Sequence, residues 1–84
     1  MQLIARYTIR DYPAFRAAFD ADAEDRGHNG LSLLQLWRED DRSAWALYQV
    51  NDATAARAYL STGSAPFNAQ AGVEATDFHF VETA

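Results

Sequence analysis

The chain has 84 residues, 49% of them hydrophobic, with a formal net charge of −5 and neither cysteine nor lysine. This length predicts one domain over residues 1–84, and the apolar content excludes a disordered chain. The acidic surface repels phosphate backbones, so we expect no nucleic-acid partner. Without cysteine, disulfides and thiolate metal sites are excluded, and with only two histidines we expect no metal site.

The sequence also predicts the cellular location of the protein. No apolar run approaches the roughly 20 residues that span a bilayer, so we expect no membrane partner. The opening segment MQLIARYTIR lacks the pattern of a signal peptide. We therefore expect a cytoplasmic protein.

The first half of the chain predicts a strand followed by a helix. Residues 2–9 alternate with a period of two, which places Leu3, Ala5, Tyr7 and Ile9 on one face. A helix is expected from about residue 12 to 26, with Asp11 as its N-cap and Pro13 in its first turn. Gly27 is expected to end this helix in the left-handed conformation.

Residues 31–50 predict a β-hairpin with a turn at Asp40 and Asp41. This turn pairs Trp37 with Ala44 and Leu33 with Tyr48, and it places Trp37 and Trp45 on opposite faces. Both faces are then apolar, which is unusual for an antiparallel sheet with one solvated side.

The rest of the chain predicts a helix, a helical turn and a last strand. The helix is capped by Asn51 or Asp52 and ends at Gly63, and the short turn spans residues 64–72. Residues 73–82 form the strand, with Asp77 and His79 on the same face.

The predicted order is β-α-β-β-α-β, an α+β ferredoxin-like fold with a four-stranded antiparallel sheet in the order 4-1-3-2. Both helices cover one face, so the other face exposes a large apolar surface. A domain of this size also has a small core. We therefore expect a homodimer that packs sheet face against sheet face.

Two segments, ARYTIRDYPAFRAAFDA and YQVNDATAARAYLSTGSAPFNAQAGV, carry a resemblance to a known group. The chain resembles the dimeric α/β-barrel superfamily, which includes antibiotic-biosynthesis-monooxygenase-like and stress-responsive barrel-like small proteins. The resemblance implies a homodimer with a ligand pocket between sheet and helices in each subunit. It also implies chemistry without a metal or organic cofactor. The second helix lacks the histidine of the haem-degrading members, which argues against that subgroup.

Three residues are candidates for catalysis. His79 has the unperturbed pKa of a general base near neutrality, and strand placement is expected to hold it beneath the helices. Some cyclase-like members of the superfamily use a late-strand histidine in this way. Tyr7 and Tyr48, on inner strands, could steer an oxyanion. The alternatives are a surface histidine and two core tyrosines with satisfied hydroxyls.

Aromatic residues are the candidates for contact with a substrate. These are Trp37, Trp45, Phe15, Phe19, Tyr59 and Phe67. Packing in the core or in a subunit interface is the alternative for each. Asp77 either orients His79 or pairs with Arg6 across adjacent strands, and the second alternative ranks slightly higher.

The sequence leaves two functions open. The first is a small-molecule-binding homodimer that acts as a cofactor-independent monooxygenase, cyclase or isomerase on a small aromatic or polyketide-like substrate. The second is a non-catalytic module that binds a ligand or assembles. An enzyme of the first kind needs a cavity of a few hundred Å³ with a polar group inside. If the helix–sheet interface is filled and His79 lies at the surface, the enzyme that uses His79 as its base is excluded.

Overall fold

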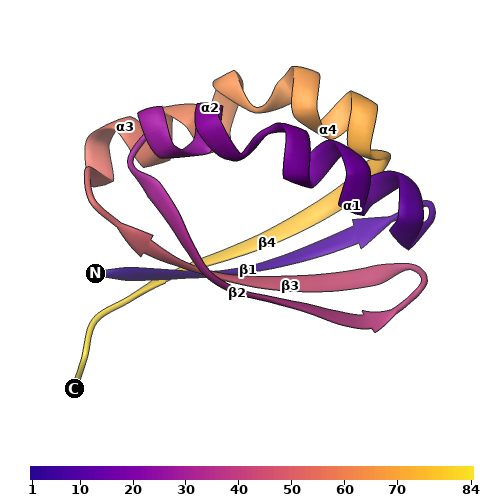
Figure 1. The fold of residues 1–84 in the computed structure, drawn as a ribbon. Coiled ribbons are helices and arrows are strands. Elements are labelled where there is room, and N and C mark those ends of the chain that lie inside the picture. The colour runs from indigo at the N-terminus through magenta and orange to yellow at the C-terminus, as the bar shows by residue number, and fades with distance from the viewer.

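The computed structural model describes all 84 residues, and it shows one sheet covered on one side by a layer of helices (Figure 1). The strands are β1 (Gln2–Ile9), β2 (Leu31–Asp40), β3 (Ser43–Val50) and β4 (Val73–Val81). The helical segments are α1 (Tyr12–Ala21), α2 (Ala23–His28), α3 (Ala53–Ala58), the π-helical η1 (Tyr59–Gly63) and α4 (Ala65–Ala71). The strands pair antiparallel in the order β2-β3-β1-β4. The predicted ferredoxin-like fold and strand order are confirmed.

Side-chain caps start two of the helices. The Asp11 carboxylate accepts a hydrogen bond from the backbone N–H of Ala14 at 2.9 Å, and α1 begins there. Asp52, rather than Asn51, caps α3 by accepting from the backbone N–H of Ala55 at 3.0 Å. These contacts satisfy N–H groups that have no partner within the helix. No helix of the structure is long and apolar enough to cross a membrane.

The helix predicted from residue 12 to 26 is broken into two. It is interrupted at Asp22, and α2 continues past the expected end to His28. Gly27 is therefore helical, and the left-handed residue is Gly30, with a φ of 82°. The prediction for Gly27 was wrong because the helical pattern continues for one more residue after it.

The hairpin register differs from the predicted one. Asp41 and Arg42 form the turn, and the register shifts between Leu33 and Gln35 and again between Arg38 and Asp40. The ten residues of β2 thus oppose the eight of β3 through two bulges. Each bulge reverses which residues face which side.

Trp37 consequently lies opposite Trp45, not Ala44. Residues directly opposite each other in a sheet point to the same side. Both tryptophans therefore face the side without helices, and the prediction that they lie on opposite faces was wrong. Leu33 does pair with Tyr48, as predicted, because it precedes the first bulge.

The hydrophobic core lies between the sheet and the helices. Its fully buried strand residues alternate along β1 and β3: they are Leu3, Ala5, Ile9, Ala44, Ala46 and Tyr48. From the helices come Phe15, Phe19, Ala56 and Ala71. The opposite face of the sheet carries no helix (Figure 1). This arrangement divides the molecule into a covered face and an uncovered face.

Candidate functional site

Two tyrosine hydroxyls meet in the core. Tyr7 on β1 and Tyr48 on β3 both face the helices, and their hydroxyl oxygens lie 2.8 Å apart. Tyr7 is 4% exposed and Tyr48 is fully buried. One hydroxyl donates to the other, and neither has a second hydrogen-bond partner in the protein. One O–H group of the pair therefore lacks an acceptor.

Burial keeps both tyrosines protonated. It raises the pKa of Tyr7 from its ordinary value of 10.0 to about 12. Burial, with a smaller contribution from the neighbouring Tyr7, also raises the pKa of Tyr48 well above 10.0. At neutral pH the pair thus offers a hydrogen-bond donor and not a base.

A second polar group lies next to the pair, at the junction of α1 and α2. Asp22 accepts a hydrogen bond from the Tyr59 hydroxyl at 2.6 Å, and its carboxylate is 3.6 Å from an Arg26 nitrogen. Arg26 is 5% exposed, donates to the carbonyl oxygen of Phe19 at 2.8 Å, and stacks over the Phe19 ring. Burial and then the hydrogen bond to Asp22 raise the pKa of Tyr59. The hydrogen bond between Tyr59 and Asp22 connects η1 to the end of α1.

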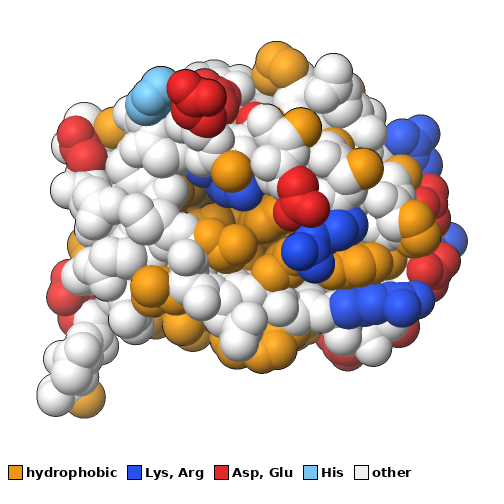
Figure 2. All heavy atoms as spheres, viewed as in Figure 1, with side chains coloured by type: hydrophobic (Ala, Val, Ile, Leu, Met, Phe, Trp, Pro, Cys, Tyr) orange, Lys and Arg blue, Asp and Glu red, His pale blue; other side chains and the backbone are white.

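Both polar groups line a small, partly enclosed cavity beneath the helices. The remaining lining residues are Leu31, Leu60, Ser64, Phe67, Asn68 and Phe78. The space has room of about 10 Å³, close to what a single water needs. Figure 2 shows hydrophobic side chains between the helical layer and the hairpin, with basic side chains among them. The helix–sheet interface is therefore filled, which differs from the open pocket that an enzyme of this type was expected to have.

The aromatic candidates divide between this cavity, the core around it and the far face. Tyr59 and Phe67 line the cavity. Phe15 and Phe19 are buried in the core but do not line it, and their rings pack against the ring of Phe67. Trp37 and Trp45 lie on the uncovered face. Their predicted contacts with a substrate therefore cannot involve this cavity.

His79 is separated from the tyrosine pair by the sheet. It lies opposite Ile4 on the uncovered face, whereas its neighbours Phe78 and Phe80 face the helices. Its side chain is exposed. The expectation that β4 holds His79 beneath the helices was wrong, because the alternation of the strand turns this residue outward. His79 cannot act on a molecule held by Tyr7 and Tyr48 in the same subunit.

Asp77 shares the uncovered face with His79. It lies directly opposite Arg6 in the sheet, but no ion pair joins them. Arg6 instead has its guanidinium carbon 5.6 Å from the centre of the Trp45 ring, and its buried Nε has no hydrogen-bond partner. Arg6 and Asp77 are thus paired in the register of the sheet, as predicted, but their side chains form no ion pair.

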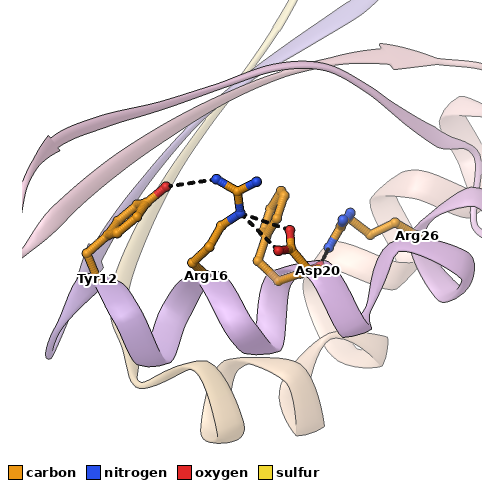
Figure 3. A network of polar contacts seen from close by, with 5 residues as sticks. Tyr12, Arg16, Asp20 and Arg26 are labelled. Carbon is orange, nitrogen blue, oxygen red and sulfur yellow. Dashed lines mark hydrogen bonds and ion pairs between the residues drawn. The ribbon is translucent and has the colours of Figure 1, made fainter.

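Two arginines of the helical layer, Arg16 and Arg26, form ion pairs with carboxylates. Along α1, Arg16 donates to both oxygens of Asp20 at 3.0 Å and contacts the Tyr12 hydroxyl (Figure 3). Arg26 follows on α2 in the same view. These contacts neutralise the positive charge of each guanidinium locally.

Asp22 and Arg26 were missed by reasoning from sequence, in which residues 20–26, DADAEDR, are only the acidic end of the first predicted helix. Their spacing of four residues was the available signal, because side chains four apart on a helix are neighbours. That spacing does not show whether a pair faces water or the core. The break at Asp22 decides it, and it turns Arg26 over Phe19.

Comparison with known proteins identifies the fold. No family model matches the chain, and neither does any curated protein. Among solved structures, SnoaB, a cofactor-independent oxygenase from Streptomyces nogalater, matches with a TM-score of 0.68 and 22% identity over 99% of this chain and 92% of SnoaB. Protein Atu4242 from Agrobacterium tumefaciens matches with a TM-score of 0.68 and 13% identity, covering 99% of this chain and 92% of that one.

An uncharacterised NIPSNAP domain protein from Burkholderia xenovorans also matches, with a TM-score of 0.63 and 17% identity over 100% of this chain and 95% of that one. These similarities confirm the ferredoxin-like α+β fold of the chain. At such identities they show the fold alone, and function depends on the site.

Proposed function

We propose that this chain is a cytoplasmic homodimer that binds a small aromatic or polyketide-like molecule in the cavity beneath its helices. The observation that carries the proposal is the buried O–H of the Tyr7–Tyr48 pair that has no acceptor. A buried donor without a partner destabilises a protein, and a ligand carbonyl or phenolic oxygen would satisfy it. The apolar walls formed by Leu31, Phe67 and Phe78 suit flat hydrocarbon rings.

Entry of such a molecule requires the cavity to enlarge, because its present room is that of one water. Residues Tyr59 and Leu60 of the wall belong to η1, a π-helical segment. Such segments are rare and are frequent at functional sites. We propose that η1 moves outward when a ligand binds.

As the catalytic form of this function we propose a cofactor-independent enzyme that stabilises an oxyanion in the enlarged cavity, without His79 as its base. Protonated Tyr7 and Tyr48 would donate to the oxygen of an enolate or phenolate formed from the substrate. Asp22 is the only carboxylate in the lining, and we propose that it, instead of His79, accepts the substrate proton. A monooxygenase, cyclase or isomerase would all share this step. The alternative is a ligand-binding module without catalysis.

The dimer would form through the uncovered sheet face. Trp37 is 47% exposed there and adjoins Trp45, while Ile4 and Leu47 lie on the same face. Burial of these apolar side chains by a second copy would remove them from water. The SnoaB and NIPSNAP-type matches support the proposal through their shared fold.

Binding is tested with α-tetralone, an aryl ketone, and with tetralin, which has the same rings without the oxygen. We expect α-tetralone to bind the wild-type protein more tightly than tetralin. The double variant Tyr7→Phe/Tyr48→Phe should bind the two compounds equally. Isothermal titration calorimetry measures both affinities. If neither compound binds, or if the double variant keeps the preference for the ketone, the proposal is wrong.

Enolate formation distinguishes the enzyme from the binding module. In D2O, stabilisation of the enolate should accelerate exchange of the α-protons of α-tetralone, which proton NMR follows directly. We expect the exchange to slow in Tyr7→Phe/Tyr48→Phe and in Asp22→Asn. Binding without any acceleration over buffer favours the non-catalytic module.

A further inference from the structure

A second hollow adjoins the cavity beneath the helices, on the side of β4. It has room of about 250 Å³ and is lined by Arg57, Leu60, Ser61, Phe78 and Phe80. Leu60 and Phe78 also line the cavity beneath the helices, so these two side chains separate the hollow from the cavity. On the inner side, the Phe78 ring lies 6.2 Å from the Tyr7 ring. The hollow therefore leads toward the tyrosine pair.

Arg57 presents an exposed positive charge at this hollow. It lies in the last turn of α3, and its guanidinium carbon is 3.9 Å from the centre of the Phe80 ring. This stacking holds the guanidinium plane against the ring and leaves its N–H edge free. No hydrogen bond or ion pair engages Arg57 within the chain.

Arg57 is one of three arginines, with Arg6 and Arg10, that form no ion pair, and it is the only one of the three that lines this hollow. Four of the seven form ion pairs with carboxylates: Arg16, Arg26, Arg38 and Arg42. The chain has twelve acidic residues, so carboxylates are abundant. A guanidinium held in place by an aromatic ring, free of carboxylates and beside an apolar hollow, is suited to an anionic ligand group.

We propose that the hollow binds an aromatic carboxylate. The carboxylate group of this ligand contacts Arg57, and its ring packs on Phe78 and Phe80. A guanidinium matches a carboxylate through two parallel hydrogen bonds. This inference rests on the proposed function and names its ligand class: a flat molecule with a carboxylate for Arg57 and an oxygen acceptor for the tyrosine pair. The hollow is the entrance, and displacement of Leu60 and Phe78 joins it to the cavity.

The test compares a ring-carboxylated α-tetralone with its neutral methyl ester. We expect the wild-type protein to bind the carboxylate roughly three- to tenfold more tightly at low ionic strength, and the difference to shrink as salt is added. Arg57→Gln should abolish the difference between the two compounds. Arg57→Lys should retain part of it, because the charge remains without the planar fork.

Arg10→Gln is the matched control. Arg10 also lacks a carboxylate partner, and it lines a third hollow with Asn68 and Glu74, which shares only Asn68 with the cavity beneath the helices. This variant removes the same charge and should keep the preference for the carboxylate. Binding of the carboxylated α-tetralone should shift the amide signals of Ser61 and Phe78 in NMR spectra of the wild-type protein.

The outcomes separate the two proposals. If the ester binds in a tyrosine-dependent manner but Arg57→Gln keeps the carboxylate preference, the role of Arg57 is refuted and the proposed function stands. Amide shifts confined to the uncovered face would also refute it. If neither compound binds the wild-type protein, the proposed function fails and the ligand class fails with it.

Discussion

At the scale of single residues, the Tyr7–Tyr48 contact links stability to ligand binding. Each hydroxyl is the other's only partner in a buried site. Replacement of one tyrosine by phenylalanine leaves the other hydroxyl without a hydrogen bond, at a cost of about 1–3 kcal/mol. Removal of both hydroxyls leaves no unpaired group.

We therefore predict that Tyr7→Phe and Tyr48→Phe each lower the free energy of unfolding, and that the double variant loses less than the sum of the two. Urea unfolding followed by circular dichroism measures all four proteins as a double-mutant cycle. Additive losses would show that the two hydroxyls are not coupled.

The buried tyrosines also predict how stability depends on pH. The pKa of Tyr7 is raised from 10.0 to about 12 in the folded protein, so folding disfavours the phenolate. The stabilisation is complete below pH 10 and is lost as the pH rises through about 12, because the unfolded chain releases the proton first. Unfolding followed by tyrosinate absorbance should show the midpoint in urea falling over this range. A midpoint that is constant up to pH 12 would contradict the burial of this hydroxyl.

At the scale of elements, the end of α2 depends on one glycine. Gly30 has a φ of 82°, and a Cβ there would lie 2.8 Å from the backbone oxygen of Asp52. Gly27, three residues earlier, is helical, and a Cβ there would meet nothing within 4 Å. The two positions form a matched pair for substitution.

We predict that Gly30→Ala destabilises the protein by about 2 kcal/mol, because a left-handed backbone and a backbone clash add together. Gly27→Ala should instead stabilise it by about 0.5–1 kcal/mol, since alanine is the better helix former. Thermal unfolding of both variants measures the difference. Equal melting temperatures would mean that the chain does not turn at Gly30.

At the scale of the whole molecule, the uncovered sheet face is the surface to test for assembly. We predict that Trp37→Glu converts the dimer to a monomer, because it places a charge within the apolar interface. Leu33→Glu is the control: Leu33 is 43% exposed, close to the 47% of Trp37, but faces the helices. Sedimentation equilibrium at micromolar concentration measures the mass. A wild-type species of 9.4 kDa would refute the dimer.

The ferredoxin-like fold was predictable because alternation in residues 2–9 and 73–82, and the caps at Asp11 and Asp52, are local features. The burial of Tyr7, Tyr48, Phe15 and Phe19 follows from the same patterns. The Asp22–Arg26 pair was not predictable, since its burial depends on a helix break that places Arg26 over Phe19.

The sequence by itself determined the order of the elements, the strand order and the covered face, because hydrophobic period and capping act within a few residues. Only the tertiary structure decided which face each hairpin residue occupies, since the bulge between Leu33 and Gln35 placed Trp37 on the side of Trp45. It also separated His79 from the tyrosines and joined Tyr59 to Asp22. These relations depend on register and on contacts between residues far apart in the chain, which no local pattern encodes.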